Sequence, residues 1–122
     1  MLINLSNHPA EGWAKEQFRE ACDRWRGVAD MPFPNIAPSW SGEEVRALAE
    51  EYFSECRQVL ATAEGPSAVH LMGEQVFCFH LTTLLREAGV TVVASTTERN
   101  VSYNPSTGMK EVYFSFIRFR EF

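Results

Sequence analysis

Three short polar stretches could do chemistry, and each comes directly after a run of apolar residues. They are SNHP at residues 6–9, GE at residues 73–74 and STTER at residues 95–99. Together they offer hydroxyl groups, an amide, one imidazole, carboxylates and one guanidinium. Such groups, with the N–H groups of helix N-termini, bind phosphate and move protons without a metal ion. If the fold brings them together, these stretches predict a site for a nucleotide or another phosphodiester.

The spacing of the apolar residues predicts the elements that must position these stretches. Strands are expected at residues 2–5, 27–34, 67–72 and 90–96, alternating with helices at residues 11–25, 42–63 and 75–88. Residues 98–119 predict two further strands around a turn at residues 104–108. This order predicts one α/β domain over residues 1–122, a Rossmann-like three-layer sandwich whose mainly parallel sheet ends in a C-terminal antiparallel β-hairpin.

Alternation along the last strand predicts which of its side chains share a face. One face is expected to hold Tyr113, Ser115, Ile117 and Phe119, and the other Val112, Phe114 and Phe116. A long apolar strand of this kind, VYFSFIRF, is expected to be paired or covered rather than left at an edge.

The ends of parallel strands share one edge of a sheet, and ligands bind there at the point where the strand order reverses. The polar stretches after the first, third and fourth strands are therefore expected to line a common site. The candidate catalytic residues are His8, Glu74 and Arg99, and the candidate ligand-binding residues are Ser6, Asn7, Trp13, Gly73, Ser95, Thr96 and Thr97.

Each stretch also has a purely structural interpretation. SNHP is a common strand-to-helix turn, and Glu74 could simply complement the dipole of the helix that follows it. Glu98 and Arg99 could form a solvated pair, and Trp13 could belong to the core rather than stack on a base. His70, within an apolar strand, is expected to be structural.

Composition narrows the possible functions. The net charge is −5 and the pI is about 5.2, which argues against long duplex nucleic acid as a partner. No segment has the apolar length of a membrane span, so we expect a cytoplasmic protein. Three widely spaced cysteines predict buried thiols, and no zinc-site spacing is present, so we predict neither a metal nor a cofactor. Neither a Walker A sequence nor G-x-G-x-x-G follows a strand.

Five segments carry a resemblance to a known group of proteins. They are INLSNHP, DMPFPNI, HLMGEQ, ASTTER and FIRFREF, which are spread over nearly the whole chain. Together they resemble small stand-alone Rossmann-like proteins associated with CRISPR loci. The predicted topology is similar to that of the CARF-related sensors and ring nucleases of type III CRISPR systems, which act in antiviral defence.

The resemblance implies a homodimer that binds a cyclic oligoadenylate across its two-fold axis and cleaves it as a metal-independent ring nuclease. In that interpretation Arg99 and the amides near Asn7 and Gly73 hold phosphates, residues 95–97 orient the ribose, and His8 is the acid or base. Three alternatives stay open. The protein could be a non-catalytic sensor or sponge, a protein-interaction subunit using its aromatic C-terminal strand, or an enzyme acting on a nucleotide or sugar phosphate.

Overall fold

A computed structural model describes residues 1–122. Five strands form one sheet in the order β2-β1-β3-β4-β5, in which only β5 runs antiparallel to its neighbour. The strands are β1 (Leu2–Leu5), β2 (Val28–Asp30), β3 (Ala68–Leu71), β4 (Thr91–Tyr103) and β5 (Lys110–Glu121). The helices are α1 (Lys15–Trp25), α2 (Gly42–Ala61) and α3 (Gln75–Glu87), with a 3-10 turn, η1, at Ala10–Gly12. The predicted α/β class and the mostly parallel sheet with an antiparallel C-terminal pair are confirmed.

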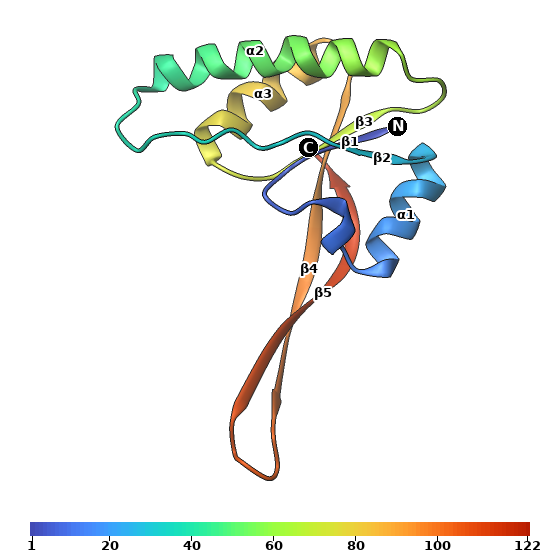
Figure 1. The fold of residues 1–122 in the computed structure, drawn as a ribbon, viewed down its shortest axis with the longest axis vertical. Coiled ribbons are helices and arrows are strands. Elements are labelled where there is room, and N and C mark those ends of the chain that lie inside the picture. Colours follow the sequence, from blue (N-terminus) through green and yellow to red (C-terminus); the bar gives the residue numbers. More distant parts are fainter.

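The strand order reverses between β1 and β3. From β1 the chain passes through α1 to β2 on one side, and from β3 it passes through α3 to β4 on the other (Figure 1). The switch point therefore lies between the carboxyl ends of these two central strands.

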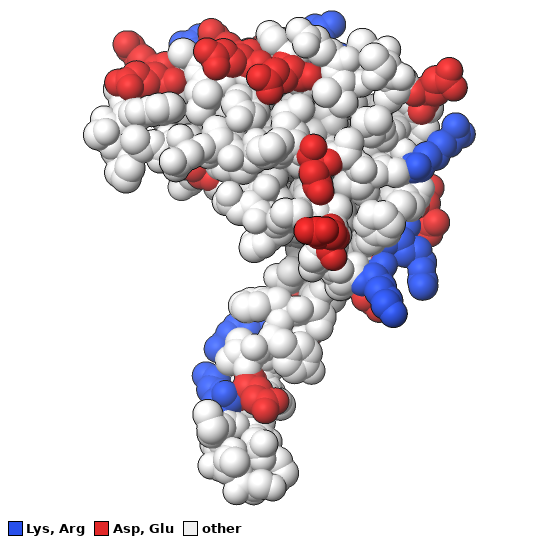
Figure 2. Space-filling model, in the orientation of Figure 1, with Lys and Arg blue, Asp and Glu red and all other residues white.

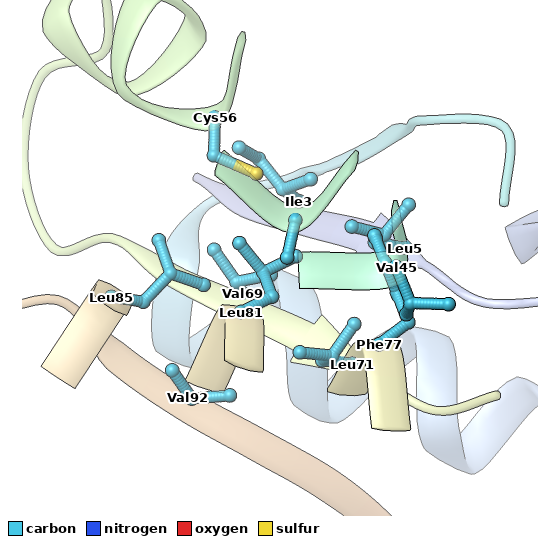
Figure 3. Packing of buried hydrophobic residues seen from close by; sticks show 11 residues of the cluster. Ile3, Leu5, Val45, Cys56, Val69, Leu71, Phe77, Leu81, Leu85 and Val92 are labelled. Atoms are coloured by element: carbon cyan, nitrogen blue, oxygen red, sulfur yellow. The ribbon is translucent and has the colours of Figure 1, made fainter. Parts of the chain in front are cut away.

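Apolar side chains cover both faces of the sheet. Along β1, Leu2 packs with Ala21 and Trp25 of α1, whereas the next residue, Ile3, packs with side chains of α2 and α3. Figure 3 shows the larger cluster, in which Phe77 and its neighbours on α3 meet the side chains of β1 and β3. Alternation along the strands thus divides the core between the two faces.

Two element boundaries differ from the sequence-based prediction. The expected helix at residues 11–25 is broken, because Trp13 and Ala14 are extended and α1 begins only at Lys15. The strand expected to reach residue 34 ends at Asp30, just before two prolines that cannot donate to a ladder. By contrast α2 begins where predicted, with Ser41 and Glu44 forming a capping box.

The largest difference is an arm. The fourth and fifth predicted strands are one strand, β4, which continues ten residues past Val93, its last residue paired with β3. Beyond that point β4 pairs only with β5, and the two strands project from the body as a two-stranded arm with its tip at residues 104–109 (Figure 1). We use "arm" below for residues 97–117.

A bulge at the base of the arm changes which side chains share a face. Thr96 pairs with Arg118 but Thr97 pairs with Phe116, so Ile117 is the extra residue. Phe119 therefore lies on the same side as Phe116, with ring centroids 5.1 Å apart. The predicted grouping of Phe119 with Ile117 is wrong, because strict alternation does not hold across a bulge.

Charge on the surface is unevenly spread. Figure 2 shows acidic side chains gathered over α2, and basic ones beside α1 and on the arm.

None of the three helices has both the length and the apolar character that a membrane crossing requires.

Candidate functional site

A row of polar residues crosses the middle of the sheet. Asp30 on β2, Asn4 on β1 and His70 on β3 are paired in register, so their side chains lie side by side on one face. Asn4 and His70 are each only 2% exposed, and all other residues of their strands are apolar. Buried polar groups of this kind are retained only when they are hydrogen-bonded.

Asn4 makes hydrogen bonds to its neighbours on both sides of the row. Its Nδ2 donates to Asp30 Oδ1 at 2.8 Å and to the carbonyl oxygen of His8 at 2.9 Å. Both partners are acceptors, which fixes the orientation of the amide. Asn4 Oδ1 then accepts from Ser6 Oγ at 2.8 Å and lies 2.9 Å from His70 Nδ1. Because a carbonyl oxygen only accepts, the proton of the neutral imidazole is on Nδ1.

His70 extends the hydrogen-bond network to β4. Its Nε2 lies 3.2 Å from Ser95 Oγ, so a neutral ring presents a lone pair to the Ser95 hydroxyl. Burial, with a smaller contribution from the charge of His8, lowers the pKa of His70 to about 4. Trp13 and Phe119 pack edge-on against the ring, at centroid distances of 5.3 and 5.6 Å. The imidazole is therefore neutral at pH 7 and held in one orientation.

Of the residues that follow β1, Ser6 belongs to the hydrogen-bond network, whereas Asn7 and His8 lie at the surface. Ser6 is buried, and besides Asn4 it contacts the backbone of His8. Asn7 and His8 are exposed, and neither side chain makes a hydrogen bond. Trp13 donates from Nε1 to the carbonyl oxygen of His8 at 3.0 Å and packs on His70, so its indole supports the network.

After β3, Gly73 and Glu74 have mainly structural contacts. A Cβ on Gly73 would lie 2.2 Å from the ring of Phe33, so this close approach requires glycine. The Glu74 carboxylate caps α3, accepting from Val76 N at 3.0 Å and from Phe77 N at 2.7 Å. Both carboxylate oxygens are therefore engaged by the helix, as the structural interpretation of Glu74 predicted, and its catalytic role stays a prediction.

Two backbone N–H groups near the switch point have no hydrogen-bond partner within the chain. The N–H groups of Asn7 and Glu74 donate no hydrogen bond within the chain, and they follow the adjacent strands β1 and β3. Neighbouring free N–H groups at strand ends are suitable donors to an anion.

The stretch STTER is not a loop. Only Ser95 joins the polar row, while the Thr96 hydroxyl donates to the carbonyl oxygen of Arg118 at 3.2 Å within the ladder. Thr97 and Arg99 lie on the arm, where Arg99 is exposed opposite Phe114. The expected clustering of Thr96, Thr97 and Arg99 with the other strand ends is wrong for this chain, because β4 continues straight past the edge of the sheet. The only ion pairs are Arg24–Glu20 and Arg46–Glu50, so Glu98 and Arg99 are not paired.

Sequence reasoning missed Asn4 and Asp30, whereas its prediction that His70 is structural is confirmed by the burial of the ring and by the partners of both ring nitrogens. A signal was present, since Asn4 interrupts the apolar run LINL and His70 interrupts AVHL. A polar residue inside a fully buried strand needs a partner on a neighbouring strand. The sequence does not show the strand register that places the three residues side by side.

The polar row itself is packed, and the larger cavities lie to its sides. One, of about 570 Å³, runs along α3 from the end of β3, and another, of about 540 Å³, lies beside α1 and includes Trp13. Neither is lined by Asn4, His70 or Ser95. No three His, Cys, Asp or Glu side chains come together to hold a metal ion.

A comparison with protein-family models finds a match over residues 1–120, to the uncharacterized protein MJ1673 family. The chain belongs to this family. The match spans the body and the arm alike, so the arm is part of the domain that defines the family. No curated protein matches the sequence.

Proposed function

We propose that this protein binds a cyclic oligoadenylate at the carboxyl edge of its sheet, as a homodimer. The observation that carries the proposal is the polar row from Asp30 through Asn4 and His70 to Ser95, next to the switch point. Open α/β sheets bind their ligands at this position. The proposed ligand class comes from the resemblance to CARF-related proteins, and type III CRISPR signalling in the cytoplasm is the context that this resemblance implies.

The groups at this edge suit a phosphodiester ring. The free N–H groups of Asn7 and Glu74 would donate to phosphate oxygens, and the exposed side chain of Asn7 adds a further donor. Ser95 would orient the ribose, because its hydroxyl is held by a buried, neutral imidazole. A ligand of this kind needs no basic face, which agrees with a net charge of −5.

A homodimer follows from the symmetry of the ligand. One copy offers a single set of strand ends, whereas a ring of four or six nucleotides presents the same groups twice. Two copies related by a two-fold axis would each contact half of the ring. In this proposal the fold is the Rossmann-like three-layer type, supported by the hydrophobic clusters on both faces of the sheet.

Cleavage would use the ligand's own nucleophile. The ribose 2′-oxygen attacks the adjacent phosphorus and the bond from phosphorus to the 5′-oxygen breaks, which leaves a 2′,3′-cyclic phosphate and a 5′-hydroxyl. One proton leaves the 2′-hydroxyl and one joins the 5′-oxygen. His8 is our candidate for moving a proton, because its ring is exposed at the edge and makes no hydrogen bond. The protein otherwise aligns the reacting groups.

One observation favours a sensor or sponge as the second candidate. Every side chain of the polar row already has a partner within the row, so the row supplies fixed positions and no free base. A site of this type binds well without turning its ligand over.

The test is to incubate the protein with cyclic tri-, tetra- and hexa-adenylate in EDTA and to follow binding and products by chromatography. Linear products with a cyclic phosphate support the nuclease. Ligand that is bound but recovered intact supports the sensor, and the absence of binding to all three rings contradicts the proposal.

Matched variants locate the site. His8→Ala should retain binding and lose roughly 100-fold or more in turnover, whereas His80→Ala, a half-buried histidine on α3, should behave as wild type. Ser95→Ala should weaken binding by roughly tenfold, the equivalent of one hydrogen bond of about 1.4 kcal/mol. A His8→Ala protein with full turnover would remove His8 from the mechanism.

A further inference from the structure

The outer edge of β5 has no partner in the chain. β5 is the last strand of the sheet, and its twelve residues run from the tip of the arm to the body (Figure 1). No backbone hydrogen bond outside the helices and the strand ladders involves a residue of β5, so no other segment pairs with this edge. Long unpaired edges accept a further strand, because their N–H and C=O groups are already aligned.

The register with β4 shows which side chains of β5 share a face. Residues paired across a ladder lie on the same face, and alternate residues of β4 share a face. One face of β5 therefore holds Lys110, Val112, Phe114, Phe116, Phe119 and Glu121, and the other holds Glu111, Tyr113, Ser115, Arg118 and Arg120. Ile117 is the bulged residue between the two halves of the strand.

The charges at the two ends of β5 complement each other. The strand begins with Lys110 and Glu111 and ends with Arg120 and Glu121, and none of these four side chains forms an ion pair in the chain. Lys110 shares a face with Glu121, and Glu111 shares the other face with Arg120. A second β5 strand, laid antiparallel along the first, would therefore place each charge beside an opposite one on the same face.

We propose that the β5 strands of two copies pair antiparallel along their outer edges, which joins the two five-stranded sheets into one continuous sheet. The inference rests on the proposed homodimer but not on the identity of the ligand. The two-fold axis passes beside Ser115, which lies opposite the same residue of the second copy. From there the cross-strand pairs are Phe114 with Phe116, Tyr113 with Arg118, Val112 with Phe119, Glu111 with Arg120 and Lys110 with Glu121.

Faces and charges together select this register. Paired residues must share a face, so each residue on the axis defines one register. With Ser115 on the axis, every residue of β5 except Ile117 is paired. Moving the axis to Phe114 leaves Arg120 and Glu121 unpaired, and moving it to Phe116 leaves Lys110 and Glu111 unpaired. Opposite charges directly across a ladder are stabilising, so the register that pairs the whole strand is also the one that its charges favour.

The free edge of β4 is a poorer interface. It is exposed only beyond Val93, where the pairing with β3 ends. In the arm β4 carries Glu98 on one face and Arg99 on the other, and each is the only charged residue of β4 on its face. Two β4 strands paired with each other would therefore give neither side chain a counter-charge.

Pairing through β5 also gives the arm the support that it lacks within one chain. An isolated two-stranded ribbon is at best marginally stable in water, whereas the two arms side by side form a four-stranded sheet. The two-fold axis is perpendicular to this sheet, so the same face of both copies lies on one side.

The arrangement places the two polar rows on that shared side. Ser95 is paired with Phe119 and lies on its face, and the arm leaves the body at the carboxyl edge. Phe119 of each copy lies beside Val112 of the other. These two residues are six ladder positions apart when Ile117 is left out, so the two copies of Phe119 are about 20 Å apart along the strands. The two carboxyl edges then face each other, as a ligand shared by both copies requires.

Reversing and then exchanging two charges tests the pairing. Glu111→Lys and Arg120→Glu should each raise the dimer dissociation constant by roughly tenfold or more in sedimentation of the full-length protein, because each turns two attractive pairs into repulsive ones. A chain that carries both substitutions has opposite charges again and should dimerise within roughly threefold of wild type. Glu55→Lys, at an exposed acid on α2, changes the net charge equally and should have no effect.

A cysteine on the axis tests the register. Ser115→Cys places two thiols opposite each other, and a disulfide spans the Cα separation of about 4.5–5.5 Å in an antiparallel pair. Mild oxidation should give a covalent dimer on a non-reducing gel, above the background of wild type with its three native cysteines. Ser102→Cys is the control and should give none, because Ser102 is on β4, at the outside of the four-stranded sheet.

Each contrary result has a distinct meaning. If wild type is dimeric and both charge reversals are equally dimeric, the β5 edge is not the interface, and this inference falls while the proposed homodimer stands. If the reversals weaken the dimer and the doubly substituted chain is not restored, or if Ser102→Cys cross-links and Ser115→Cys does not, the register is overturned. A wild type that is monomeric with and without cyclic tetra-adenylate overturns both the pairing and the homodimer.

Discussion

The body and the arm share the strand β4, but they differ in which side chains are buried. The body buries polar side chains, whereas the arm leaves apolar side chains exposed. In the body, β4 pairs with β3 and β5, and the polar residues Asn4 on β1 and His70 on β3 are buried and hydrogen-bonded. In the arm, β4 pairs only with β5, and its apolar side chains are exposed.

Burial and exposure have different energetic consequences in the two regions. Burying polar groups fixes their positions, because each has a specific partner and leaving one unpaired is costly. Exposing apolar groups leaves free energy to be gained when they are covered. The body therefore holds its polar groups in fixed positions, and the arm leaves an apolar surface exposed.

The largest expected contrast is between the aromatic residues of the two regions. Phe77 is fully buried, with Phe33 and Tyr52 packed edge-on at centroid distances of 5.3 and 5.4 Å. Phe77→Ala should lower the free energy of unfolding by about 3–5 kcal/mol, measured by urea denaturation. A loss below about 1 kcal/mol would mean that the body is not organised around this residue.

The polar row should give the body a pH dependence. The pKa of His70 is about 4 in the folded protein and about 6.5 when unfolded, so the unfolded chain binds a proton first as the pH falls. Stability from this group is complete above pH 6.5 and declines from there to about pH 4, by about 3 kcal/mol. Urea denaturation across this range should show the decline in wild type and not in His70→Gln. Equal slopes in both proteins would contradict a buried, neutral His70.

Replacing Glu74 distinguishes a structural role from a catalytic role for this residue at the carboxyl edge of the sheet. Glu74→Ala should cost about 1 kcal/mol of unfolding free energy, through loss of the α3 cap. Turnover of a cyclic oligoadenylate should be unchanged once the protein is folded. A selective loss of turnover with normal stability would return Glu74 to the catalytic residues.

The smallest stability effect is expected on the arm. Phe114→Ser should change the free energy of unfolding of the monomer by less than about 0.5 kcal/mol, because that ring is 65% exposed. The measurement belongs at a protein concentration low enough to keep the chain monomeric. A loss of 2 kcal/mol there would show that the arm packs on its own body, which would remove the contrast between the two regions.

Local patterns predicted much of the body correctly. The capping box at Ser41 and Glu44 placed the start of α2, since capping depends on residues three apart in the chain. The apolar runs LINL and AVHL predicted buried strands because every side chain there lies between two layers. The same local logic failed at residues 95–99, where polar residues indicated a loop although hydrogen bonds to β5 continue the strand.

The sequence by itself determined the α/β class and the alternation of strands and helices as far as β4, because these depend on periodicity and on short-range turns and caps. Only the tertiary structure decided that Asp30, Asn4 and His70 form one row, because register joins residues up to 66 positions apart in the chain. It also decided that the C-terminal hairpin is an arm. A strand's own residues favour extension, but the neighbours in space determine whether its faces are covered.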